Sequence, residues 1–180
     1  MTVELSILNY GNLNDYLKYI EINGRKYFEG IPPQGMNELL GGDFNGDGLK
    51  DIKLTVFYMG SGLASLNMRI VYFFQKPGQM FIKVAFDDKQ NGNRLERDIN
   101  EDGNFEIITM TLANYESHNY WTFNAYNFVD DQLVCVNEKV NYPIMVQLLY
   151  RDNYEITKHL SRSKMKQFEL KEPENLKIEK

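Results

Sequence analysis

Cysteine is nearly absent from this chain of 180 residues, since Cys135 is the only one. A lone cysteine excludes a disulfide framework, and its apolar neighbours Leu133, Val134 and Val136 predict a buried thiol. The chain also lacks any run of eighteen apolar residues, so we expect no membrane-spanning helix. Residues 1–4 carry no cationic and apolar leader region. A chain of this length without a membrane-spanning run predicts one soluble domain.

Catalytic motifs are missing as well. The only two histidines, His118 and His159, stand at no recognised spacing from Cys135 or from a serine, so a catalytic triad is unsupported. The net charge of −5 gives no global positive field that would favour nucleic acid. We therefore expect a protein that is not an enzyme.

The chain does contain one acidic pattern twice, at residues 43–51 and 98–106. Both copies read D-x-N-x-D-G-x-x-[D/E], which places oxygen-bearing side chains at positions 1, 3, 5 and 9. Glycine at position 6 permits a sharp bend, and a backbone carbonyl at position 7 adds a further oxygen. Calcium prefers such ligands, so the pattern predicts two Ca²⁺ sites. The alternative is a polar hairpin corner that binds no metal.

An EF-hand would need a bidentate Glu at loop position 12, but Leu54 and Thr109 stand there. The segments that follow the loops, 52–58 and 107–112, are rich in β-branched residues and predict strands rather than helices. Both loops are therefore expected to lead directly into a strand.

A calcium loop that runs into a strand resembles the FG-GAP and VCBS-type repeats, the blades of integrin-α-like β-propellers. Residues 42–52 resemble their signature almost position for position, whereas the second loop differs by Glu101 at position 4 and by Glu at position 9. The resemblance implies that side chains at positions 1, 3, 5 and 9 and the carbonyl at position 7 hold the metal. The implied ligands are Asp43, Asn45, Asp47, Leu49 and Asp51 at the first site, and Asp98, Asn100, Asp102, Asn104 and Glu106 at the second.

The similarity between the two copies continues beyond the loops at an offset of about 55 residues, which predicts repeat units at about 43–97 and 98–150. Each unit contains a loop, a strand and a hairpin, and Asn23-Gly24 predicts one more hairpin upstream. We expect a mostly β fold: an antiparallel, propeller-like or sandwich-like repeat within a single domain of residues 1–168. Ten to twelve strands are too few for a closed propeller.

The end of the chain differs in character. After Pro143, an apolar run predicts a last strand, and residues 152–168 predict a short amphipathic helix. The charged tail, residues 169–180, is expected to be partly disordered.

Aromatic residues are dense between the second loop and its hairpin. Tyr115, Tyr120 and Trp121 lie among Asn and Ser residues, a setting that suits a recognition surface for protein or sugar. The alternative is a strand that alternates between core and solvent, with Tyr120 and Trp121 on opposite faces.

These features lead to three functional hypotheses. The first is a non-enzymatic, calcium-stabilised binding module exported by a bacterium. It would contact a protein partner, and an inhibitor or immunity protein against a cell-wall-degrading enzyme is one example by analogy. The second is a carbohydrate-binding accessory domain that uses the aromatic residues, and the third is a structural repeat of a larger adhesin. An extracytoplasmic location is expected because weak calcium loops fill best at near-millimolar calcium.

Overall fold

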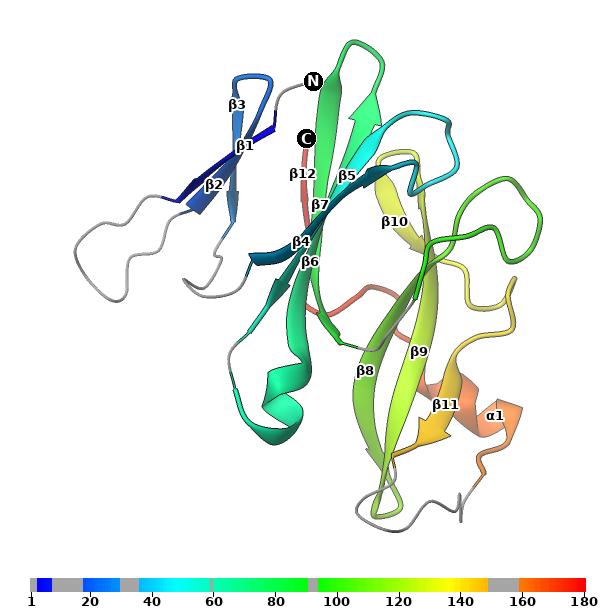
Figure 1. Ribbon diagram of the computed structural model, residues 1–180. Coiled ribbons are helices and arrows are strands. Elements are labelled where there is room, and N and C mark those ends of the chain that lie inside the picture. Colours follow the sequence, from blue (N-terminus) through cyan, green and yellow to red (C-terminus); the bar gives the residue numbers. More distant parts are fainter. Residues whose placement is uncertain (1–2, 8–17, 30–35, 59, 91–93, 149–158) are drawn as a thin grey trace.

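The computed structural model describes residues 3–7, 18–29, 36–58, 60–90, 94–148 and 159–180. These residues form twelve strands, one α-helix of a single turn and two 3₁₀ turns (Figure 1). The strands are β1 (Val3–Ile7), β2 (Lys18–Ile22), β3 (Arg25–Glu29), β4 (Met36–Gly42), β5 (Asp51–Phe57), β6 (Asn67–Lys76), β7 (Met80–Lys89), β8 (Ile107–Tyr115), β9 (His118–Val129), β10 (Gln132–Cys135), β11 (Ile144–Gln147) and β12 (Lys177–Glu179). The helix α1 is Arg162–Met165, and the 3₁₀ turns are Gly62–Leu66 and Lys166–Phe168.

The strands form three antiparallel sheets. The first has the order β1-β2-β3, and the second has the order β12-β7-β6-β5-β4. In the third sheet the long strand β9 pairs with β8 along one edge, and with β10 and β11 along the other. The prediction of a mostly β, antiparallel fold is confirmed. Within the described residues no sheet closes into a barrel.

The predicted hairpins are also confirmed. Asn23 and Gly24 connect β2 to β3 with φ angles of 51° and 83°, which is the backbone that a two-residue hairpin turn requires. The hairpins β6–β7 and β9–β10 each follow a loop and its strand, as the repeat predicts. The run after Pro143 forms β11, which pairs with β9.

Two hydrophobic cores lie on the opposite faces of the second sheet. Alternate residues of β6 point to opposite faces, so Val71 and Phe73 join the first core whereas Tyr72 and Phe74 join the second. The first core contains Ile20, Ile22 and Tyr27 of the first sheet. The second contains Ile107, Tyr126, Phe128 and Leu133 of the third sheet. The second sheet is therefore covered on both sides.

Aromatic stacking and a buried ion pair join the second and third sheets. The rings of Phe74 and Phe128 stack with centroids 3.9 Å apart. Asp88 accepts a hydrogen bond from Met110 N at 2.7 Å, and Arg94 donates to Ile108 O at 2.8 Å. Arg94 and Asp88 also pair with each other at 3.0 Å. Together they bind backbone groups of β8 at the edge that does not pair with β9.

The C-terminal region differs from its prediction. Residues 152–158 of the predicted helix lie outside the described residues, and the described part contains only α1 and one 3₁₀ turn. The prediction of a partly disordered tail is wrong for residues 177–179, because they form β12 on the edge of β7. This pairing is non-local, so no sequence pattern reveals it. No described helix has the length and apolarity needed to cross a membrane.

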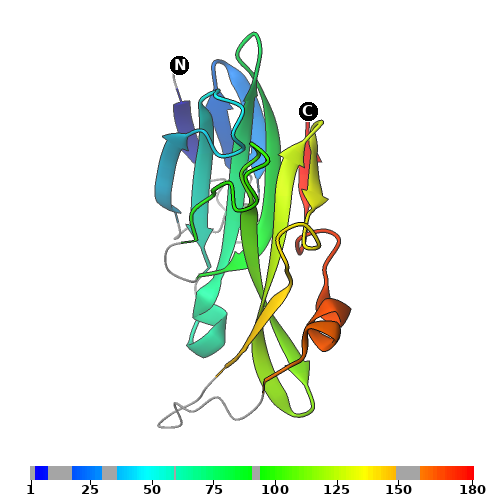
Figure 2. The same cartoon turned by 90° about the vertical axis from the view of Figure 1, so that its right-hand side faces the viewer.

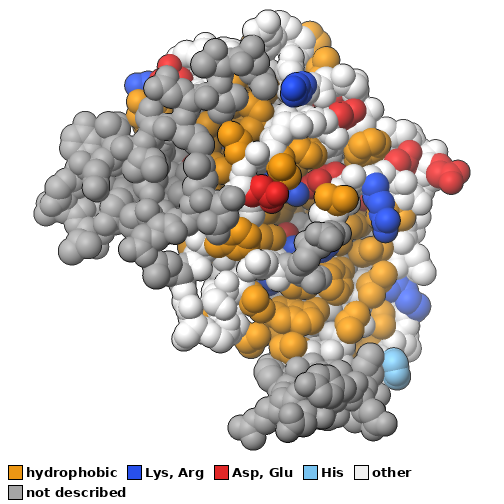
Figure 3. Space-filling view, in the orientation of Figure 1, with side chains coloured by type: hydrophobic (Ala, Val, Ile, Leu, Met, Phe, Trp, Pro, Cys, Tyr) orange, Lys and Arg blue, Asp and Glu red, His pale blue; other side chains and the backbone are white. Residues whose placement is uncertain are grey.

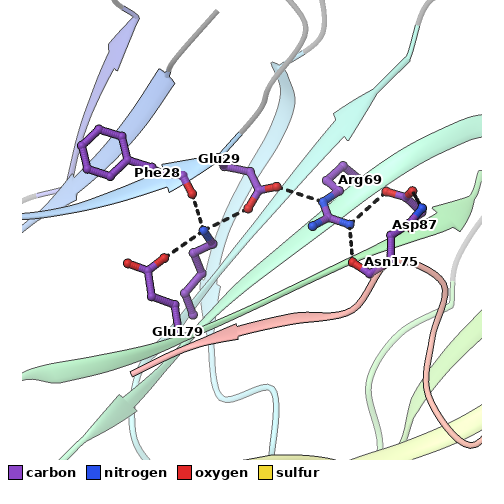
Figure 4. A network of polar contacts seen from close by, with 7 residues as sticks. Phe28, Glu29, Arg69, Asp87, Asn175 and Glu179 are labelled. Atoms are coloured by element: carbon purple, nitrogen blue, oxygen red, sulfur yellow. Dashed lines mark hydrogen bonds and ion pairs between the residues drawn. The ribbon is translucent and has the colours of Figure 1, made fainter.

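A network of buried charges ties the first sheet to the second (Figure 4). Glu29 accepts from Arg69 at 3.1 Å and pairs with Lys83 at 3.0 Å, and all three side chains are at most 5% exposed. Arg69 also pairs with Asp87 and donates to the carbonyl of Asn175, while Lys83 also pairs with Glu179. The network thus links β3, which carries Glu29, to β12, which carries Glu179.

We predict that Glu29→Ala lowers the free energy of unfolding by about 3 to 5 kcal/mol, because it leaves two buried cations without their shared partner. Glu179→Ala is the matched control. That carboxylate is 42% exposed, so its loss should cost about 1 kcal/mol or less. Urea midpoints measure both variants, and equal losses would contradict a dominant role for Glu29.

Candidate metal centre

The first acidic loop connects β4 to β5 and folds around its own amides. Asp43 accepts hydrogen bonds from Gly46 N at 2.7 Å and from Gly48 N at 2.9 Å. The side-chain oxygen of Asn45 accepts from Asp47 N, and Asp47 accepts from Leu49 N. The side chains at positions 1, 3 and 5 therefore hold the bend of the loop, in agreement with the short polar residues in the pattern.

The second loop, which leads into β8, repeats these contacts. Asp98 accepts from Gly103 N at 2.8 Å, Asn100 accepts from Asp102 N at 3.0 Å, and Asp102 accepts from Asn104 N at 3.0 Å. Glu101 has a φ angle of 61°, a left-handed conformation that is unusual for a side chain of this length. The equivalent residue of the first loop is Gly46, at φ 86°. Two loops of different sequence thus reach one geometry.

The acid at position 9 closes each loop. Asp51 accepts from Phe44 N at 2.9 Å, and Glu106 accepts from Ile99 N at 2.7 Å. Both carboxylates have an exposed fraction of 0%. The other oxygen of Asp51 accepts from Gln75 N of β6 at 2.8 Å, which attaches the first loop to its sheet. The sequence gives no sign of this contact, because the donor is a backbone amide 24 residues away.

The two loops lie against each other on one side of the molecule (Figures 1 and 2). Phe105 N donates to Asn45 O at 3.1 Å. Gly46 faces the carbonyl of Gly103 so closely that a Cβ at this position would lie 2.5 Å from the oxygen. The loops, which are about 55 residues apart in the chain, therefore form one centre at the junction of the second and third sheets.

The donor set of each loop suits a hard cation, since it consists of carboxylate, amide and carbonyl oxygens. Among the described residues, no three His, Cys, Asp or Glu side chains form a group that could hold a metal ion by themselves. A calcium shell at either loop therefore depends on Asn45 or Asn100 and on the carbonyls of Leu49 or Asn104 in addition to the acids.

Burial is the main cause that raises the pKa of Asp51 to about 6; the two amide hydrogen bonds oppose this shift, and the nearby charges of Asp47 and Asp43 add to it. A bound cation would compensate these charges, so the raised pKa of Asp51 fits a calcium site. Since a proton competes for the same carboxylate, calcium should bind the first loop more weakly as the pH falls below about 6.

The second loop is more exposed, and its electrostatics differ. Hydrogen bonds from the side chain and backbone of Asn104 lower the pKa of Asp102 to about 2. Lys139, which the sequence does not single out, donates to Asp102 at 3.3 Å from a position that is 61% exposed. A metal at this loop would compete with that lysine for one carboxylate oxygen.

The three aromatic residues of the proposed recognition surface do not form one surface. Tyr120 is 1% exposed, and its ring lies on the face of the third sheet that the C-terminal segment covers. Tyr115 lies on that same face and packs edge-on against Phe168, with centroids 5.8 Å apart. Trp121 lies on the opposite face and is half-buried. This segment is therefore a strand whose side chains alternate between two faces, which is the alternative to a recognition surface.

Comparisons with protein-family models, with curated proteins and with solved structures find no match to this chain. The resemblance to FG-GAP and VCBS-type repeats therefore depends on the residues of the loops.

The contact between the loops can be tested with two glycines that share one backbone conformation. Gly48→Ala at φ 80° meets no atom within 4 Å, so it should cost only the strain of the left-handed region, about 1 to 2 kcal/mol. Gly46→Ala at φ 86° has the same strain and also collides with the Gly103 carbonyl. We predict an additional loss of about 1 to 3 kcal/mol in a urea unfolding experiment. Equal losses would mean that the contact contributes nothing.

Proposed function

We propose that this protein is a non-enzymatic, calcium-stabilised binding module. The observation that carries the proposal is the junction of the two acidic loops, each of which is closed by a buried carboxylate. Calcium at both loops would neutralise these acids and fix the third sheet on the second. In this view the metal is structural, because calcium surrounded by protein oxygens is a weak Lewis acid without redox chemistry.

We further propose that the two sheets with their loops are blades of a propeller-like repeat. In support, the pair Ile52–Phe73 in the second sheet corresponds to the pair Ile107–Tyr126 in the third, each next to the last residue of a loop. A weak calcium site fills best outside the cytoplasm, so we propose an extracytoplasmic location in a bacterium.

The proposed partner-binding surface is the outer face of the third sheet, defined by Leu112, Trp121, Phe123, Ile144 and Val146. Leu112 and Val146 are directly opposite Trp121 on neighbouring strands, and Ile144 is opposite Phe123. Leu112, Ile144 and Val146 are 36%, 38% and 41% exposed, and the two aromatic rings are half-buried. Figure 3 shows hydrophobic side chains gathered over this part of the molecule.

Beyond the part that joins the second core, this sheet reverses the usual pattern, in which the apolar face is buried and the polar face is exposed. Its other face carries Thr111, Tyr120 and Thr122, yet these side chains are buried, with exposed fractions of at most 7%. The C-terminal segment covers them, and Leu170 bonds to both Asn124 and Tyr126. An apolar face left half-open while a polar face is covered favours a partner that buries the apolar face. We propose a protein partner with an apolar contact surface, such as an enzyme that this module inhibits.

A carbohydrate-binding function would require an exposed, coplanar aromatic pair among Tyr115, Tyr120 and Trp121. Because Tyr120 is buried and Trp121 lies on the other face, no observation favours this second hypothesis.

Calcium should raise the melting temperature of the protein well above its value in a chelator, because the ions relieve repulsion among the carboxylates of each loop. Asp47→Ala removes a ligand from the loop that matches the calcium pattern better. It should lose more of this stabilisation than Asp102→Ala, which removes a ligand from the loop that matches the pattern less closely. Differential scanning calorimetry measures both, and an unchanged melting temperature for the unmutated protein would refute structural calcium.

Trp121→Ala should abolish capture of the partner and cost only about 1 to 2 kcal/mol of stability, since the ring is half-buried. Tyr120→Ala should instead cost about 3 to 5 kcal/mol, because that ring is buried. The control is Leu39→Ala on β4, which is 46% exposed and lies outside the outer face. Urea midpoints and pull-down from a bacterial envelope fraction provide the readouts. Equal capture by the Trp121 and Leu39 variants would rule out the outer face.

A further inference from the structure

The two loops differ at the carboxylate that closes them. In the first loop both oxygens of Asp51 accept backbone hydrogen bonds, from Phe44 N and Gln75 N. In the second loop only Oε2 of Glu106 has a partner, which is Ile99 N. Oε1 of Glu106 is buried and has no hydrogen-bond partner among the residues that the structure describes. An ionised oxygen in that position is costly unless a positive group compensates it.

A second orphaned group lies beside this oxygen. Strands β8 and β9 pair Ile107 with Tyr126, and one further step in that register places Glu106 opposite Asn127 on a shared face. Asn127 is 2% exposed, and within the described part of the chain neither its Oδ1 nor its Nδ2 has a hydrogen-bond partner. Glu106 and Asn127 thus present unsatisfied oxygens from neighbouring strands.

The corresponding position in the first loop is apolar. The pair Ile52–Phe73 corresponds to Ile107–Tyr126, so the counterpart of Asn127 is Phe74, which packs in the second core. The first loop therefore combines a shorter acid with a neighbouring phenylalanine, whereas the second combines a longer acid with a neighbouring amide. The longer acid and the amide together provide oxygen beyond the loop itself.

Asn127 also lies next to the second loop in space. It lines a cavity of about 390 Å³ together with Asn104, the loop residue whose carbonyl is a candidate ligand. Turned with Oδ1 toward the loop, the amide would direct Nδ2 toward this cavity, where solvent could accept its hydrogen bonds. One orientation of the side chain would then satisfy both of its polar atoms.

We propose that Asn127 of β9 supplies an oxygen ligand to the cation at the second loop, beside Glu106. This inference rests on the proposed calcium function, because it extends one of the two proposed sites. The ligands of the second site would then come from both the loop and β9, the middle strand of the third sheet. Calcium binding at this loop would then fix β9, which also carries Trp121 of the outer face.

The test uses calcium alone, titrated by calorimetry into the full chain that carries Asp47→Ala. The first loop has lost a ligand in this background, so the remaining binding reports the second loop. Asn127→Leu should weaken that binding about tenfold or more. It should not lower stability in a chelator, because it removes an amide that has no partner there. Asn127→Asp, which keeps the oxygen and adds a charge, should bind calcium more tightly.

Thr122→Val is the matched control, since this hydroxyl is also buried on β9 without a partner in the described part of the structure. Its calcium affinity should stay within about twofold of the background protein. In a ¹H–¹⁵N spectrum of the unmutated chain, the side-chain amide signal of Asn127 should shift as calcium fills the second loop. This measurement does not require any variant to fold.

Calcium binding that Asn127→Leu leaves unchanged, with an amide signal that does not move, would overturn the role of Asn127 and leave the proposed function intact. If the unmutated chain binds no calcium at either loop, both the proposed function and this inference fail.

Discussion

The structure depends on one packing constraint, which is that the second sheet has both of its faces buried. Strand β6 is buried over most of its length, and alternate residues enter different cores. Because a strand presents successive side chains to opposite faces, each face needs its own covering layer. The first sheet supplies one layer. The part of the third sheet that carries Tyr126, Phe128 and Leu133 supplies the other. The order of the described layers follows from this need.

Polar groups fix how these layers meet. The buried Glu29 joins Arg69 and Lys83, so separating the first sheet from the second would remove the buried partner that these two cations share. On the other side, Asp88 and Arg94 occupy the free edge of β8 in place of a further strand. The acidic loops lie at the same junction, which explains how a bound cation there could stabilise the contact between two sheets and not merely one turn.

The third sheet is covered differently from the second. The C-terminal segment covers its polar face, and its apolar outer face is half-exposed. Trp121, at the centre of this outer face, and Asn127, beside the second loop, are both on β9 and on the same side of the sheet. In the proposed function, calcium at the second loop would therefore act next to the strand that carries the proposed contact surface.

The sequence by itself determined the local features. Asn23-Gly24 predicted a hairpin turn, β-branched runs predicted β5 and β8, and the repeated D-x-N-x-D-G pattern predicted two loops of equal geometry, because each of these depends on neighbouring residues. Only the tertiary structure decided the contacts between distant segments. These include the approach of Gly46 to Gly103, the pairing of β12 with β7, and the burial of Tyr120 while Trp121 faces outward. An alternating strand shows in sequence that its faces differ, but which face is covered depends on layers that arrive from elsewhere in the chain.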